Sequence, residues 1–320
     1  MQKIDEKSIN YIKKNLLHNL KPKDKSFLIK KLLNSDSKTR TRFIKECLYS
    51  SVAEVVGTAM ILMEEFFKQI DTKNKIKIMS YLKNKDEWVR ERASALLRKF
   101  ADQSDLPQIE EGLKDKNDLV RSYLTEALGK IKNDRSAHLI LTLLKDKSDL
   151  VRVSAIETAE LLKLKKAIPQ LKKSLNDKSF LVREYAISGL YTLCGKKSLP
   201  ILETRLKKEK TIEVGTELMV ALYFCEPKES ILNDFIEMLN DRKSFVREAS
   251  IVSLPRLINK KNRQKIIETL KITIRKESDK GLRKQIRKGL KAIVEKGTGT
   301  EYPTARTRRQ WLKREETKMH

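Results

Sequence analysis

A seven-residue phrase returns at a fixed interval along the chain. Three copies read Asp-Lys-x-x-Leu-Val-Arg and begin at Asp115, Asp146 and Asp177, so each copy lies 31 residues after the one before it. Self-similarity at such a period is typical of a solenoid, in which one unit cannot bury its apolar face alone and stacks on its neighbours. We therefore expect one continuous array of repeats.

Each period contains two amphipathic segments. In residues 135–162, apolar side chains recur at helical spacing on both sides of a polar turn at residues 145–149. The pattern predicts an all-α fold, a right-handed α-α superhelix of about seven to eight helical hairpins. Small residues in the middle of the second helices are expected to let helices cross closely. They are Ala155, Ala159, Ala186 and Gly189. Ser148, Ser179 and Ser244 are predicted to cap second helices.

An acidic residue precedes the arginine of each repeat by six positions. Stacking would bring these groups to one edge, where each guanidinium can bond to carboxylates or turn carbonyls of its own and the adjacent repeat. We interpret them as a structural ladder and not as phosphate-binding arginines, because each arginine has an acid assigned to it. The predicted ladder residues are Asp115, Arg121, Asp146, Arg152, Asp177, Arg183, Asp241 and Arg247, with Asp36/Arg42 and Glu277/Arg283 as outlying pairs.

The repeated pattern D-x-x-x-x-V-R-x-x-A-x-x-A-L is similar to HEAT repeats of the bacterial variety named after phycobilisome lyases. The resemblance covers residues 84–258 well, and residues 24–52 and 262–296 less closely. It implies a HEAT-like solenoid. Its implication for activity is broad, because the family includes scaffolds, chromophore lyases, hydroxylases and DNA glycosylases.

Two breaks interrupt the array. Between Arg42 and Arg90 lie 48 residues, with an extra apolar segment around residues 59–70. We therefore predict an irregular N-terminal helical cap and first repeat over residues 1–83, HEAT-like repeats over 84–296 and a basic tail over 297–320. At the second break Gly215 replaces the arginine, which is expected to remove one rung of the ladder.

The charge of the chain is strongly positive and uneven. Of the net charge of +27, about half lies in residues 256–320, which hold 21 Lys and Arg against 7 Asp and Glu. Clustered basic groups are the footprint of a polyanion-binding protein. The candidate polyanion-binding residues are Arg283, Lys284, Arg287, Lys288, Arg306, Arg308, Arg309, Trp311, Lys313 and Arg314. A solvated lysine-rich surface, a docking segment and an anionic membrane surface remain alternative interpretations.

No motif for catalysis stands out. The three histidines form no His-Glu pair of the kind that holds iron in the HEAT-like hydroxylases, and no phosphate-binding glycine loop or nucleophile elbow occurs. Trp88 occupies a position filled by Leu or Phe in other copies, so we interpret it as a core residue and not as part of a glycosylase site. We expect no enzyme activity, no cofactor and no metal.

The remaining expectations concern environment and partners. The three cysteines lack metal-site or disulfide spacing, and no apolar run is long enough to cross a membrane, so we expect a cytoplasmic protein without membrane insertion. The leading hypothesis is a non-enzymatic scaffold or adaptor that binds a protein partner on its concave face. The alternative is nucleic-acid binding through the basic C-terminal repeat and tail.

Overall fold

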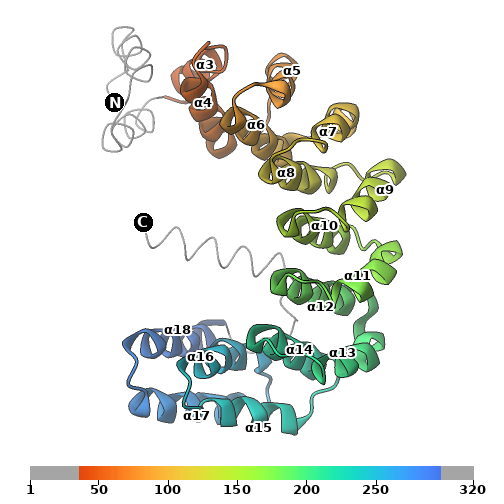
Figure 1. Ribbon diagram of the computed structural model, residues 1–320. Helices are drawn as coiled ribbons and strands as arrows, with labels where there is room; N and C mark the ends of the chain where they lie inside the picture. Colours follow the sequence, from red (N-terminus) through yellow and green to blue (C-terminus); the bar gives the residue numbers. More distant parts are fainter. Residues whose placement is uncertain (1–35, 297–320) are drawn as a thin grey trace. The chain divides into compact units, whose positions relative to one another are not determined.

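The computed structural model describes residues 36–296, which belong to two compact units that meet in sequence between Leu143 and Leu144 (Figure 1). Every regular element in these residues is a helix, and none of them forms a strand. The predicted all-α class is thus confirmed. The predicted boundary at 83/84 stays a prediction, and the tail at 297–320 lies outside the described residues.

The described part of the first unit, residues 36–143, pairs helices into hairpins. Its helices are α3 (Ser37–Cys47), α4 (Ala53–Phe66), α5 (Thr72–Ser80), α6 (Glu87–Phe100), α7 (Leu106–Gly112), α8 (Asp118–Leu128) and α9 (Asp134–Leu143). Short 3-10 turns, η1 (Tyr81–Lys83) and η2 (Gln103–Asp105), join α5 to α6 and α6 to α7. The second helices α4, α6 and α8 pack side by side in one layer, with α3, α5 and α7 in another (Figure 1).

The described part of the second unit, residues 144–296, repeats this plan. Its second helices are α10 (Asp149–Leu161), α12 (Phe180–Cys194), α14 (Ile212–Cys225), α16 (Ser244–Ser253) and α18 (Lys280–Lys296). Its first helices are α11 (Ile168–Ser174), α13 (Leu199–Leu206), α15 (Glu229–Met238) and α17 (Arg263–Lys276). The 3-10 turns η3 (Lys165–Ala167), η4 (Gly195–Ser198) and η5 (Leu254–Leu257) precede α11, α13 and α17. Consecutive second helices contact one another in a layer, and α12, α14, α16 and α18 each contact the first helix that precedes them.

The core runs between these two layers. On α10, Val151, Ala155 and Ala159 are fully buried, and they lie three or four residues apart on one face of the helix. On α12, a Cβ added at Gly189 would lie 3.0 Å from Leu171 Cδ1 on α11. The small residues thus occupy close helix crossings, as the sequence pattern predicts.

The predicted serine caps are wrong. Ser148 and Ser179 hold the N-cap positions of α10 and α12, but neither side chain bonds to the free backbone N–H groups there. On α16 the N-cap is Lys243, and Ser244 is already the first helical residue. Asn117 does cap its helix: its Oδ1 accepts hydrogen bonds from the backbone N–H groups of residues 119 and 120.

At the N-terminal end the outlying ladder pair is also corrected. Arg42 lies on α3, a first helix, and its side chain is 79% exposed and bonds to Glu46 one turn later. It therefore cannot occupy the second-helix ladder position. Trp88, at the start of α6, is half-buried and covers Gly57 on α4: a Cβ at Gly57 would lie 1.9 Å from Trp88 Cζ3.

Candidate functional site

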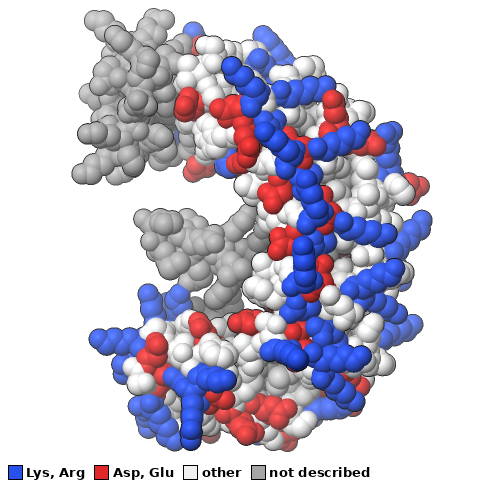
Figure 2. Space-filling model, viewed as in Figure 1, with Lys and Arg blue, Asp and Glu red and all other residues white. Residues whose placement is uncertain are grey.

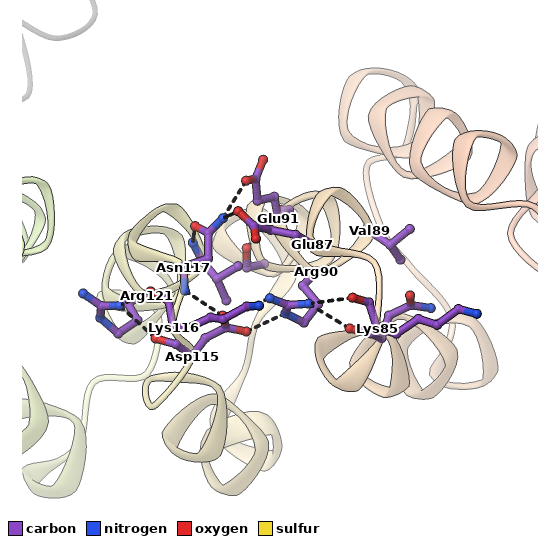
Figure 3. Close-up of polar contacts among 12 residues, drawn as sticks. Lys85, Glu87, Val89, Arg90, Glu91, Asp115, Lys116, Asn117 and Arg121 are labelled. Atoms are coloured by element: carbon purple, nitrogen blue, oxygen red, sulfur yellow. Dashed lines mark hydrogen bonds and ion pairs between the residues drawn. The ribbon is translucent and has the colours of Figure 1, made fainter. Parts of the chain in front are cut away.

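The turn edge of the first unit shows how one rung is built. The guanidinium of Arg90 on α6 donates from Nε and Nη2 to the Asp115 carboxylate of the next repeat, at 2.7 and 3.2 Å (Figure 3). Its Nη1 donates to the backbone carbonyls of Asn84 and Lys85 in its own turn. A planar guanidinium suits this two-sided contact, because its donors point in fixed directions.

The same contacts recur along the second unit. Arg152 bonds to the Asp177 carboxylate at 2.9 and 2.7 Å, and Arg183 bonds to Glu209 at 3.1 and 3.2 Å. Arg247 bonds to Glu277 at 2.8 and 2.9 Å. Each Nη1 also donates to two carbonyls of its own turn, which include those of Asp146, Asp177 and Asp241.

These contacts differ from the sequence pairing in one respect. For Arg152, Arg183 and Arg247, the acid six residues before the arginine gives it a backbone carbonyl, whereas the carboxylate comes from the following repeat. Arg121 follows the first half of this rule, because its Nη1 donates to the carbonyls of Asp115 and Lys116 at 2.8 and 3.1 Å. The carboxylate of Asp146 accepts a hydrogen bond from the backbone N–H of Ser148. In a complete rung, the arginine side chain thus joins its own turn to the neighbouring repeat.

Ion pairing lowers the pKa of the ladder acids Asp115 and Glu209. Burial alone would raise the pKa of Asp115, but hydrogen bonds from Arg90 and the Asn117 backbone outweigh it and lower the pKa. Burial also opposes ionisation of Glu209, yet Arg183, Thr211 and Arg205 lower its pKa to about 2. Because these charges are compensated within the ladder, it has the features of a structural element and not of a ligand site.

The array lacks one rung at Gly215. No side chain is present there to reach Asp241, whose carboxylate accepts the backbone N–H of Lys243, as the carboxylates of Asp115 and Asp177 accept theirs from Asn117 and Ser179. Glu209, the ladder acid before this break, has an additional partner in Arg205 on α13, with which it forms an ion pair. The Nε of Arg205 also donates to the Leu175 carbonyl at 2.6 Å. The sequence pattern did not indicate this role for Arg205, because it lies on a first helix outside the repeated phrase.

Two further polar contacts between repeats were not predicted. Arg256 after α16 forms an ion pair of 2.8 Å with Glu217 on α14, whose side chain is 2% exposed. The hydroxyl of Tyr223 accepts hydrogen bonds from the side-chain amides of Asn259 and Asn262, both at 2.8 Å. Neither contact belongs to the repeated phrase, so periodicity could not reveal them.

Exposed lysines accompany the ladder. In four successive turns the residue after the ladder acid is an exposed lysine, at Lys116, Lys147, Lys178 and Lys210. Figure 2 shows Lys and Arg side chains next to Asp and Glu on one face of each unit. The turn edge therefore carries a row of exposed lysines beside the ladder, whose own acids are paired with arginines.

The predicted polyanion-binding residues fall into two groups. Lys284, Arg287 and Lys288 are exposed on α18, whereas Arg283 is half-buried at the ladder position and donates weakly to the Ser278 carbonyl, at 3.5 Å. The others lie outside the described residues: Arg306, Arg308, Arg309, Trp311, Lys313 and Arg314. Within the described residues, the candidates Lys284, Arg287 and Lys288 thus lie together on α18.

Apolar side chains are exposed mainly on the second helices. Ten large apolar side chains are exposed among residues 36–296, and six of them lie on second helices of the second unit. These six are Leu161, Phe180, Leu181, Phe245, Val252 and Val294. Phe180, Leu181 and Phe245 are 46%, 43% and 51% exposed, and each stands in the first two residues of its helix. Ile212 is half-buried at the corresponding position of α14.

The described residues contain no group of three or more His, Cys, Asp or Glu arranged to hold a metal ion. None of their helices is long and apolar enough to span a membrane. Burial raises the pKa of the Cys225 thiol on α14, so this cysteine is held in its unreactive form.

Comparison with known proteins identifies the repeat type. Two overlapping segments, residues 77–160 and 136–223, match the family described as HEAT repeats. A chain in the structure of Kap95p bound to RanGDP has a similar fold, with a TM-score of 0.50 and 10% identity over 86% of this chain and 45% of that one. At this identity the likeness concerns the fold alone.

Two other solved structures are similar at lower scores. YibA of Escherichia coli matches with a TM-score of 0.44 and 21% identity, over 69% of this chain and 93% of YibA. The CpcE–CpcF complex of phycocyanin lyase from Nostoc sp. PCC7120 matches with 0.40 and 14%, over 79% and 94%. No curated protein sequence matches the chain.

Proposed function

We propose that the chain, whose residues 77–223 match the HEAT-repeat family, is a non-enzymatic scaffold that binds a protein partner on its second helices. The observation that carries this proposal is the exposed apolar row at the starts of α12 and α16, formed by Phe180, Leu181 and Phe245. Exposed large apolar side chains at corresponding ends of helices in one layer are suited to binding a protein, and aromatic residues contribute much of the affinity at such surfaces.

The ladder supports the same assignment. The ladder arginines are occupied by carboxylates and turn carbonyls, so they fix the spacing of the second helices and leave the apolar row to make contacts. A rigid row of regularly spaced helices suits an extended ligand. The proposal includes a cytoplasmic location and no cofactor.

The experiment compares two matched double variants in affinity capture from extracts of the native cell. Phe180→Asp with Phe245→Asp places charges on the second helices, whereas Ile76→Asp with Ile272→Asp places them on α5 and α17, where both isoleucines are exposed. Quantitative mass spectrometry should show partners reduced at least tenfold by the first pair and unchanged by the second. Equal capture by both variants, with unchanged circular dichroism, would contradict the proposal.

A second candidate function is nucleic-acid binding. It is favoured by the exposed turn lysines, such as Lys147 and Lys178, and by the exposed Lys284 and Lys288 on α18. Each lysine that neutralises a phosphate releases condensed counterions, so binding of this kind weakens steeply with salt. Fluorescence anisotropy with short DNA and RNA tests it: binding that persists at physiological salt and falls with Lys284→Glu and Lys288→Glu supports this function. Binding that vanishes with salt contradicts it.

A further inference from the structure

The second unit carries exposed basic side chains where three of its second helices begin. These are Lys178 before α12, Lys210 before α14, and Arg242 with Lys243 before α16. Because α12 contacts α14 and α14 contacts α16, the three turns follow one another along the same edge. Within residues 36–296, the side chains of Lys178, Lys210 and Arg242 form no ion pair and no hydrogen bond. These cations are therefore available to a ligand.

The acids of these turns leave the edge positive. The ladder already binds two of the carboxylates, because Asp177 pairs with Arg152 and Glu209 pairs with Arg183. The exposed charged side chains over residues 176–181, 207–213 and 241–245 comprise six bases and two acids: Lys178, Lys207, Lys208, Lys210, Arg242 and Lys243, with Glu213 and Asp241. The exposed charge at the starts of these helices is thus that of an anion-binding surface.

Large apolar side chains lie beside these bases. Phe180 and Leu181 are the first two residues of α12, and Phe245 is the second residue of α16. All three side chains are exposed. On α16 the two kinds of side chain adjoin, because the Nζ of Lys243 lies 5.8 Å from the centroid of the Phe245 ring. A ligand can therefore make ion pairs and apolar contacts at the same place. We call the following residues the basic-apolar edge: Lys178, Phe180, Leu181, Lys210, Lys243 and Phe245.

We propose that the basic-apolar edge binds an extended peptide segment in which acidic residues alternate with aromatic or other large apolar residues. Its carboxylates pair with the lysines, and its apolar side chains cover Phe180, Leu181 and Phe245. Successive side chains of an extended chain point to opposite sides, so alternation gives the segment one anionic side and one apolar side. This inference rests on the proposed protein-binding function and adds the chemistry of the partner.

A nucleic acid is the competing ligand for the same lysines. The phosphates of a duplex would pair with them. The charged outer surface of the duplex would leave the exposed phenylalanines without an apolar contact. A single strand can stack bases on Phe180 and Phe245, but Leu181 has no aromatic face to offer a base. The apolar members of the edge therefore favour a peptide.

The spacing of the helices sets the length of the segment. Packed helices lie about 8 to 10 Å apart, so the two steps from α12 to α16 cover about 16 to 20 Å. An extended chain advances about 3.3 Å per residue, so roughly 5 to 6 residues cross the edge. An alternating segment of this length presents about three carboxylates to the three turns.

The probes are three fluorescent peptides of about 12 residues, long enough to extend past the edge at both ends. The first alternates glutamate with phenylalanine and leucine. The second has the same composition in two blocks, and the third has lysine in place of glutamate. We expect the full-length protein to bind the alternating acidic peptide at least tenfold more tightly than either of the others at physiological salt. Equal affinity for the alternating and blocked peptides would overturn the proposal, as would tighter binding of single-stranded DNA of the same length.

Charge reversal in the protein tests the lysines. Lys178→Glu with Lys210→Glu should weaken binding of the alternating acidic peptide at least tenfold. The control is Lys166→Glu with Lys197→Glu, which changes the net charge by the same amount. These two exposed lysines lie in η3 and η4, which follow the ends of α10 and α12. Equal weakening by the two pairs would show that net charge alone attracts the peptide, and the site would be wrong.

Truncation tests the apolar members of the edge. Phe180→Ala with Phe245→Ala should weaken the same peptide at least tenfold, because the apolar side of the segment loses its contacts. Ile76→Ala with Ile272→Ala is the matched control, since both isoleucines are exposed on the first helices α5 and α17. Circular dichroism checks that all variants are folded. An effect no larger than that of the control would contradict the proposal.

Two outcomes separate this inference from its premise. If Phe180→Asp with Phe245→Asp loses the native partner and Lys178→Glu with Lys210→Glu retains it, the scaffold function stands and the acidic partner is wrong. If the peptides depend on the edge as expected but the native partner is captured equally by the Phe180→Asp, Phe245→Asp variant and its control, the scaffold proposal fails. The preference of the edge for acidic segments then stands by itself.

Discussion

Arg152 joins two repeats through one guanidinium: its Nε and Nη2 bond to the Asp177 carboxylate of the next repeat, and its Nη1 bonds to the carbonyls of its own turn. The side chains of Arg152 and Asp177 are only 8% and 15% exposed. Turn closure and repeat stacking are therefore coupled. The stability of a solenoid is approximately the sum of the stability of each repeat and the stability of each interface between neighbouring repeats. The contacts of Arg152 contribute to both.

Removing this guanidinium should destabilise the second unit. Arg152→Ala leaves the Asp177 carboxylate and two turn carbonyls without these donors in a largely buried site. We expect the free energy of unfolding to fall by about 3 kcal/mol. Urea unfolding followed by circular dichroism measures it. Arg42→Ala is the matched control, because that arginine is exposed on α3, and it should change stability by less than about 0.5 kcal/mol. A similar loss for both variants would refute the structural role of the ladder.

Acid should weaken the rung formed by Glu209. Its pKa is about 2 in the folded protein, against an ordinary value of 4.5, because its ion pairs outweigh the effect of burial. A lowered folded pKa adds stability above the ordinary value, and this stability is lost as the pH falls from about 4.5 towards 2. Glu209→Gln should therefore lower Tm near neutral pH and leave a smaller fall in Tm between about pH 6 and pH 3. Parallel Tm curves for the variant and the natural protein would contradict this assignment.

The repeated phrase predicted the helical class and the edge at which the arginines meet, because both depend on local periodicity. It did not predict which carboxylate each guanidinium binds. That choice depends on how far one repeat is shifted against the next, and the shift places Asp177 rather than Asp146 beside the Nε of Arg152. The pair of Arg256 and Glu217 shows the same limit, since it joins residues 39 positions apart that no repeated motif contains.

Net charge likewise gave the size of the basic excess but not the face on which it lies. In the sequence, Lys280, Lys284, Lys288 and Lys291 belong to a general basic cluster. Helical periodicity places all four on one side of α18, where their side chains are exposed.

The contact between Trp88 and Gly57 should be sensitive to a single methyl group. A Cβ at Gly57 would overlap the indole ring, with Trp88 Cζ3 at 1.9 Å and Cη2 at 2.3 Å. Gly57→Ala must displace the ring from the junction between α4 and α6, and we expect a loss of about 1 to 3 kcal/mol. Thermal unfolding measures the loss, and tryptophan fluorescence in a Trp311→Phe background reports whether the ring becomes more exposed. An unshifted emission maximum with unchanged Tm would contradict this packing.

The missing rung should be restorable. Gly215 has no atom within 4 Å of an added Cβ, and it occupies the position that arginine holds in the neighbouring repeats. Gly215→Arg should stabilise the unit by about 1 kcal/mol through helix propensity, with a further contribution of about 1 kcal/mol from a new contact with Asp241.

A double-mutant cycle with Asp241→Ala isolates the contact, and Gly215→Ala measures the propensity gain by itself. If stability rises equally for Gly215→Arg and Gly215→Ala and the coupling to Asp241 is near zero, the repeats on the two sides of Gly215 do not share the ladder register. The alignment of α14 with its neighbours would then be wrong.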